Sequence, residues 1–395
     1  MSLFRRIPLK KCTELLLTAK SVHRIPQYEV RRFLGESLKS PGQTHSQSKT
    51  VGVWLLGCAG LVYGAVALGG VTRLTESGLS MVNWDLFRTM KPPFNQREWE
   101  LEFERYKAYP EYKFKSSNEE MTLNQFKFIW TMEYLHRMWG RAIGLAFLIP
   151  CTYFWYKGRF NGAMKKRMLL AGGLICAQGA VGWWMVKSGL NPENNSNRDI
   201  PRVSQYRLTT HLSMAFVLYA MFLWTGLSNV LKPADHTAIQ GIKKFRGITH
   251  GAKALIFLTA IFGGFVAGLD AGLVYNSWPK FADRWLPENM TSKSPAWKNF
   301  FENEVTVQFI HRNLAYLTLL SITMTWLKGR RLALHPRAKI ALHGLMAMGY
   351  AQAILGISTL VHHVPVWLAA LHQSGSMALI GFVLWLSNEI RRIPK

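Results

Sequence analysis

The sequence predicts an all-α membrane protein with eight transmembrane helices, arranged as two tandem pseudo-symmetric four-helix bundles. Apolar segments of about 20 residues recur along the chain, which is the length that crosses roughly 30 Å of hydrocarbon. Basic residues are concentrated in the short loops between these segments, and motifs of the first half return in the second half in the same order. Only 18% of the 395 residues are charged, which favours one polytopic protein over two or three soluble domains.

Residues 1–50 are expected to form a mitochondrial transit sequence, or matrix leader. They contain ten Lys/Arg residues against three acids, and "FRRIPLKKCTELLLTAK" can form a short basic amphipathic helix. No long apolar segment precedes Val51, which argues against a secretory signal. A disordered basic tail in the cytoplasm is the alternative.

The eight spans are predicted near 52–73, 128–156, 167–187, 206–230, 250–270, 306–327, 338–361 and 366–388. The connections 157–167 and 328–339 each carry five basic residues and no acid. The positive-inside rule therefore places these connections and both termini in one compartment, the matrix of a mitochondrion. The longer loops, 75–127 and 271–305, mix acids with bases and fall on the intermembrane-space side. The net charge of +26 is thus read as a topology signal, and no nucleic-acid partner is predicted.

An internal repeat divides the chain into halves. "GGVTRLTESGLSMVNW" from Gly69 aligns without a gap with "GGFVAGLDAGLVYNSW" from Gly263, and "AQGAVG" from Ala177 aligns with "AQAILG" from Ala351. The predicted domains are an N-terminal four-helix bundle at 51–230, a matrix linker at 231–249 and a C-terminal four-helix bundle at 250–392. Each half has four spans, so the two halves have the same orientation.

The repeat pairs four histidines that lie near the starts of even-numbered spans. His136 aligns with His311, and His211 aligns with His372. Two imidazoles facing each other in a bundle core suit the axial positions of a haem iron. A zinc site would require more ligands. A histidine taken alone is more often a packing residue or a proton relay than a ligand, and it is the repeat that favours coordination.

Charged residues adjoin two of these histidines. Arg137, Arg141 and Arg312 could pair with haem propionates. Glu133 lies one helical turn before His136, whereas Gln308 takes the corresponding place before His311. A carboxylate can accept a proton or stabilise a cation, which an amide cannot do. The asymmetry predicts one reactive site and one redox relay, with a structural ion pair of Glu133 as the alternative.

At residue level the chain resembles the mitochondrial haem A synthase family. The similarity is carried by "GGVTRLTESGLSMVNW", "EYLHRMWGRAIG", "THLSMAF", "GLDAGLVYNSWP", "FIHRNLAY" and "LHQSGSMALIGFVLWL", and it covers residues from about 51 to 392. Bacterial relatives often have a cysteine pair in the first long external loop, and residues 75–127 contain no cysteine.

The resemblance implies an inner-membrane oxidoreductase that converts haem O to haem A for cytochrome c oxidase. The C8 methyl of the porphyrin would become a formyl group, with water as the oxygen source. Haem b would be held by His311 and His372, and the substrate haem O by His136 and His211. Glu133 would be the catalytic carboxylate.

The resemblance also implies partners. A farnesyltransferase would supply haem O, a mitochondrial ferredoxin-type protein would exchange electrons, and membrane lipid would surround the spans. A homo-oligomer is compatible with it. Two other functions account for the histidines: a cytochrome b-type electron-transfer protein with two haems, and a non-catalytic haem chaperone. The first gives Glu133 no role, and the second does not require two matched histidine pairs.

Overall fold

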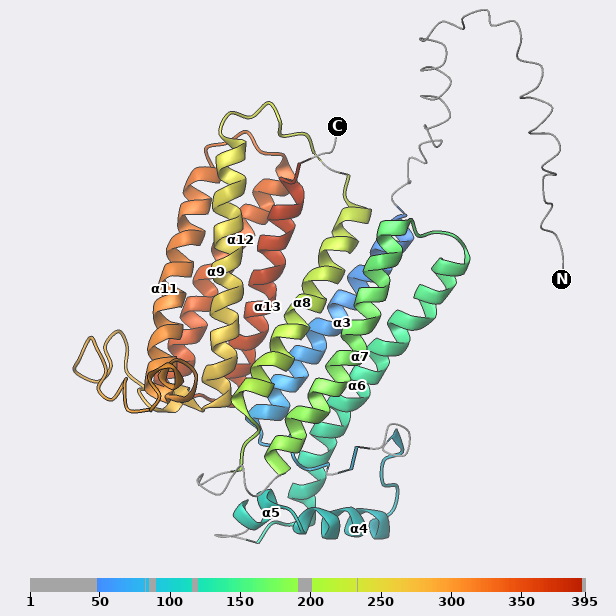
Figure 1. Ribbon diagram of the computed structural model, residues 1–395, viewed down its shortest axis with the longest axis vertical. Helices are drawn as coiled ribbons and strands as arrows, with labels where there is room; N and C mark the ends of the chain where they lie inside the picture. Colours follow the sequence, from blue (N-terminus) through green and yellow to red (C-terminus); the bar gives the residue numbers. More distant parts are fainter. Residues whose placement is uncertain are drawn as a thin grey trace, which may run out of the picture. The chain divides into compact units, whose positions relative to one another are not determined.

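The computed structural model describes residues 48–81, 83–84, 90–115, 120–190, 201–232 and 234–392. The leader predicted at 1–50 therefore lies outside the described residues, except for its last three. Each of the eight predicted apolar segments is one helix (Figure 1). These helices are α3 (Lys49–Leu74), α6 (Leu123–Tyr156), α7 (Gly162–Leu190), α8 (Gln205–Val230), α9 (Ile242–Gly268), α11 (Glu304–Gly329), α12 (Pro336–Val361) and α13 (Val366–Glu389).

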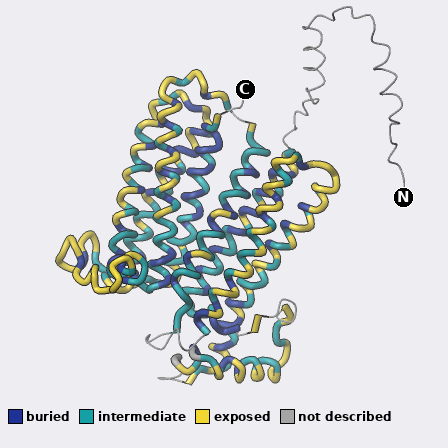
Figure 2. Tube along the Cα trace, viewed as in Figure 1, coloured by how far each residue is buried: buried dark blue, intermediate teal, exposed yellow. Residues whose placement is uncertain are grey.

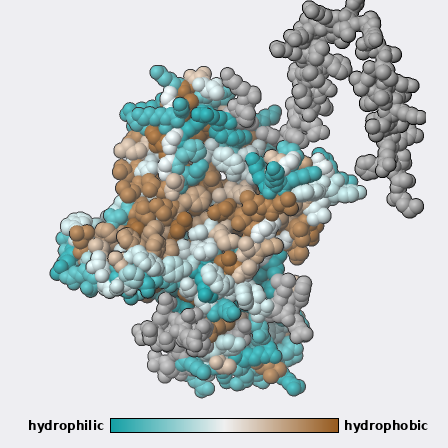
Figure 3. All heavy atoms as spheres, viewed as in Figure 1, coloured by the Kyte–Doolittle hydropathy of each residue, from teal (hydrophilic) through white to brown (hydrophobic). Residues whose placement is uncertain are grey.

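Within the described part of the chain, six helices are long and apolar enough to cross a membrane: α3, α7, α8, α9, α12 and α13. The other two long helices, α6 and α11, carry the arginines of the predicted site. On the face drawn in Figure 3, hydrophobic residues gather over the middle of the helices and hydrophilic residues gather towards their ends. The chain is thus an all-helical, multi-pass membrane protein.

The long helices pack mainly within each half of the chain. Helix α3 packs against α6 and α8, and α7 packs against α6 and α8. In the second half, α11 packs against α9 and α12, and α13 packs against α9 and α12. The halves meet where α13 contacts α3 and α8, and where α8 contacts α9.

Local chemistry explains where the helices begin. Helix α6 starts at Leu123 because Thr122 and Gln125 form a capping box, which satisfies backbone N–H groups that the first turn leaves without partners. The predicted span began five residues later, at the first apolar run. Helix α9 starts at Ile242 after Gly241, whose φ is +84°, so its first turns lie within the range predicted as a linker.

Both long loops, 75–127 and 271–305, contain short helices. The first holds α4 (Gln96–Lys107) and α5 (Pro110–Lys115), and the second holds η3 (Ala271–Leu273), η4 (Ala296–Lys298) and α10 (Asn299–Glu302). Phe103 and Tyr106 of α4 are buried against Phe126 and Trp130 at the start of α6. The burial drawn in Figure 2 accordingly continues beyond the long helices into the first loop. This loop is folded onto the helix that carries Glu133 and His136.

An ion network joins the halves at the C-terminal ends of α3 and α9. Glu76 and Asp270, which the repeat aligns, each follow one of these helices with φ near +51° and +52°. Arg202 lies 3.3 Å from Glu76 and 2.8 Å from Asp270, and Arg73 donates to Asp270 at 2.7 Å. The two acids are thus bridged by the same arginine.

Helices α3 and α8 approach closely where two glycines face each other. A methyl group at Gly52 would stand 2.6 Å from Val230 Cγ2 and 3.0 Å from the Gly226 carbonyl oxygen. Small residues at such crossings allow membrane helices to pack backbone to backbone.

Gly52→Ala is expected to lower the free energy of unfolding by about 1–3 kcal/mol, the usual cost of overpacking. Gly60→Ala is the matched control, since its added methyl would meet nothing within 4 Å. Thermal unfolding of both variants in the same detergent measures the difference. Equal stability of the two variants would contradict the expectation.

Candidate functional site

Each of the four predicted histidines packs against a glycine of the preceding long helix. The pairs are His136 with Gly69, His211 with Gly182, His311 with Gly263 and His372 with Gly356. A methyl group added to the glycine would stand 2.7, 3.2, 3.3 and 2.8 Å, respectively, from the Cε1 atom of the histidine ring. The repeat aligns Gly69 with Gly263 and Gly182 with Gly356. Each half therefore contains two contacts between a histidine and a glycine, at aligned positions.

The four histidines occupy matching places in the two halves. His136 and His211 lie on α6 and α8, His311 and His372 lie on α11 and α13, and all four side chains are half-buried. One imidazole pair per half, facing one iron, stays a prediction of the repeat.

The ring nitrogens fit a haem iron. His311 Nδ1 lies 3.1 Å from the Thr259 carbonyl oxygen, and this contact orients an imidazole so that Nε2 is left for a metal. Nδ1 of each of the other three is buried without a hydrogen-bond partner. The glycine beside each ring leaves room for the imidazole, since a larger side chain there would collide with it. Haem bound here would supply one-electron redox chemistry at its iron.

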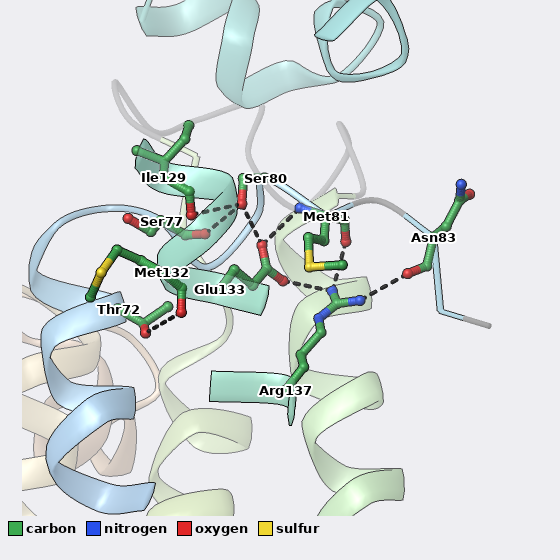
Figure 4. A network of polar contacts seen from close by, with 9 residues as sticks. All are labelled: Thr72, Ser77, Ser80, Met81, Asn83, Ile129, Met132, Glu133 and Arg137. Carbon is green, nitrogen blue, oxygen red and sulfur yellow. Dashed lines mark hydrogen bonds and ion pairs between the residues drawn. The ribbon is translucent and has the colours of Figure 1, made fainter. Parts of the chain in front are cut away.

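Glu133 is almost fully buried, at 3% exposure, and holds the loop that follows α3 (Figure 4). Its Oε2 accepts hydrogen bonds from the Ser80 hydroxyl at 2.7 Å and from the Met81 N–H at 2.8 Å. Its Oε1 accepts from Arg137 at 2.6 Å. Three hydrogen bonds, one of them from a cation, thus fix the position of this buried carboxylate.

Arg137 completes this network. It donates to the backbone carbonyls of Met81 at 2.6 Å and Asn83 at 2.8 Å, and it lies over the Trp84 ring at 4.3 Å. Arg141 is half-buried and its Nη1 is 3.8 Å from Met138 Sδ. The ion pair that was the alternative interpretation of Glu133 is thus present, and its partner is Arg137, one turn away on α6.

The C-terminal half repeats the loop contact with different chemistry. Gln308 donates to the carbonyls of Ala271 at 2.7 Å and Tyr275 at 3.1 Å. Arg312 donates to the Ser277 carbonyl and lies over the Phe281 ring at 4.2 Å. In both halves the residue three before the histidine and the arginine after it tie the external loop to the helix. Only the N-terminal half does so with a carboxylate.

Some residues of the site are visible only in the fold. Gly69 and Gly263 could have been found from the repeated glycine pair, since a repeated glycine in a helix indicates a close approach. Ser80 could not, because its counterpart in the repeat is Val274 and no local pattern distinguishes it. Gln373, next to His372, donates to the Val66 carbonyl at 2.7 Å and packs against Gly70. This contact ties the C-terminal histidine helix to α3.

Comparison with known proteins is consistent with this site. The model of the COX15-CtaA family, described as a cytochrome oxidase assembly protein, matches residues 52–384. The chain is 54% identical to human heme A synthase COX15 over 347 residues, which is 88% of this chain and 84% of the human protein. It is 44% identical to the Saccharomyces cerevisiae heme A synthase COX15, over 87% of this chain and 76% of that protein.

Bacterial proteins are similar as well. Heme A synthase of Nitrosospira multiformis is 41% identical over 353 residues, covering 89% of this chain and 96% of the bacterial protein. The match to the family model includes all four histidines, Glu133 and the three arginines. This chain therefore belongs to the COX15-CtaA family of cytochrome oxidase assembly proteins.

Proposed function

We propose that this protein is a haem A synthase, which oxidises the C8 methyl group of haem O to a formyl group. The observation that supports this most directly is the doubled site: two pairs of half-buried histidines, each ring against a glycine. The named relatives compared above are heme A synthases, not electron carriers of the cytochrome b type or haem chaperones.

The two pairs would have different tasks. His311 and His372 would hold haem b as the resident cofactor, and His136 and His211 would hold haem O as the substrate. The carboxylate of Glu133, three residues from His136, supports this order, because the corresponding Gln308 cannot accept a proton. Arg137, Arg141 and Arg312 remain candidates for propionate contacts, although Arg137 and Arg312 already hold loop carbonyls.

The conversion of a methyl to a formyl group with water as the oxygen source releases four electrons and four protons. Glu133 would accept a proton at a carboxylate oxygen, and Ser80 and the Met81 N–H would keep that oxygen in place. Electrons would leave through the C-terminal site to a ferredoxin-type partner.

The location follows from the same proposal. The protein would cross the mitochondrial inner membrane eight times as two tandem four-helix bundles, with residues 1–50 as the transit sequence. Both termini and the basic connections would face the matrix. Haem O would come from a farnesyltransferase in the same membrane, and membrane lipid would cover the exposed faces. A homo-oligomer of this chain is compatible with the proposed arrangement.

Protein purified from membranes that contain a haem O source is expected to carry haem B together with haem O, its hydroxylated form or haem A. Extraction, chromatography and mass determination of the haems measure this. Membranes without the haem O source are the control and should yield haem B alone. Haem B alone from both preparations would refute the proposed function.

A further inference from the structure

A groove opens between the two halves, along α3, α6 and α13. Its volume is about 650 Å³, within the range of sites that take organic ligands. Small and apolar residues line it, among them Gly64, Ala67, Val71, Trp139, Ala370 and Ser374. The indole N–H of Trp139 donates to the Leu61 carbonyl at 2.8 Å, so this wall is fixed to α3.

The groove lies at the level of the histidine sites. Leu68, which lines it, directly precedes Gly69, the glycine that contacts the His136 ring. Trp139 follows His136 by three residues on α6, which places it one helical turn away. Leu371, on the opposite wall, directly precedes His372.

The corresponding place in the other half is filled. The repeat pairs Gly69 with Gly263 and His372 with His211. In this alignment, three residues that line the groove correspond to aromatic residues. Leu68 aligns with Phe262, Val71 with Phe265, and Trp367 with Tyr206. These three rings pack around Phe301, which comes from α10 of the second external loop, with centroid distances to Phe301 of 5.3 to 6.4 Å.

The difference between these two places corresponds to a difference between the two haems. Haem O carries a long farnesyl-derived tail, and haem b carries a short vinyl group in its place. On α3 and α6, the helices of Gly69 and His136, there is an open apolar groove that α13 of the other half completes. Its counterpart on α9, the helix of Gly263, is completed by Tyr206 of α8 and holds aromatic rings. Axial ligation alone leaves a porphyrin free to rotate about the line between its two imidazoles, so a tail held in a groove would select which edge faces Glu133.

On the basis of the proposed function, we propose that this groove binds the isoprenoid tail of haem O and thereby orients the macrocycle held by His136 and His211. The tail runs between α3 and α13, past Ala67 and Ser374. Orientation of this kind places one methyl group at the reacting position and keeps the others away.

Filling the groove tests the proposal. Ala67→Phe and Ser374→Phe place a ring in it from opposite walls, and Ile149→Phe, on a face of α6 that is 65% exposed, is the matched control. Purified protein already loaded with haem b is titrated with haem O or with haem B, and absorption changes give the affinity of the second haem. Retained haem b serves as the folding check.

Both groove variants are expected to bind haem O about 5- to 150-fold more weakly, because the added ring occupies space that the tail needs, with unchanged affinity for haem B. Unchanged haem O affinity would overturn the proposal, and so would an equal loss for both haems, which would indicate a distorted histidine site. A phospholipid that stays bound at saturating haem O in the wild type but not in Ala67→Phe, seen by native mass spectrometry, would also overturn it.

Failure of the proposed function is distinguishable from failure of this inference. Wild-type protein that binds haem O with the expected groove dependence but forms no haem A would refute the synthase function and leave the tail site standing. Wild-type protein that converts haem O while the groove variants convert it equally well, with equal affinity, would refute only the tail site.

Discussion

Replacement of His372 by alanine is expected to yield protein without haem B, whereas replacement of His211 is expected to leave haem B bound and to abolish haem A formation. The two residues are aligned by the repeat and have the same surroundings, each ring against a glycine. Because even outer contacts of a metal ligand change affinity by about 10–100-fold, loss of the ligand itself should lower haem retention by at least about 100-fold. His311→Ala should behave as His372→Ala does, and His136→Ala as His211→Ala does.

Haem B content per protein and haem A formation are measured on the same preparations. His343→Ala is the control, since His343 lies in α12, accepts a hydrogen bond from Trp326 at 3.0 Å and has no counterpart in the first half. The control variant should retain haem B and form haem A as the wild type does. Equal loss of haem B from His136→Ala and His372→Ala would show that the halves are not specialised, and the assignment of substrate and cofactor would then be wrong.

The helices were predictable because apolar runs of membrane length leave little choice of structure. In a membrane the backbone must satisfy its own hydrogen bonds, so such a run becomes a helix. Boundaries were less predictable where a polar cap decides them. Thr122 caps α6 ahead of the apolar run, and the basic stretch from Ile242 joins α9 although it has the composition of a loop.

The histidine pairs were predictable because the repeat supplies long-range information that a single motif lacks. One aligned histidine is weak evidence, but two in the same order in both halves imply the same place in two similar bundles. The number of spans and the tandem arrangement were deduced from the same alignment. The tandem arrangement stays a prediction, and so does the count of eight spans, because the charged residues of α6 and α11 reduce the apolar character of these two helices.

The environment of Glu133 could not be predicted from its helix alone. Periodicity places Glu133 one turn from His136 and one turn from Arg137. The other two donors, Ser80 and Met81, come from a loop more than fifty residues away, and nothing in the local pattern fixes how that loop folds back. The same limitation applies to the groove, since its walls come from three helices in both halves.

Glu133→Gln is expected to lower haem A formation by about 10²–10⁴-fold, the usual contribution of a general acid or base, while both haem sites remain filled. The amide keeps the size of the carboxylate but cannot accept a proton. The amide oxygen can keep the hydrogen bonds from the Ser80 hydroxyl and the Met81 N–H, whereas the NH2 group would face the Arg137 donor. Loop attachment therefore needs a variant of its own.

One further variant distinguishes these roles. Ser80→Val introduces the residue type found at the aligned position, Val274, and removes one hydrogen bond to Glu133. It should lower haem A formation less than Glu133→Gln does, because the Met81 N–H and Arg137 still hold the carboxylate. If Glu133→Gln kept wild-type turnover while Ser80→Val lost haem O, the carboxylate would be a loop anchor, and the proton acceptor would have to be sought elsewhere in the N-terminal half.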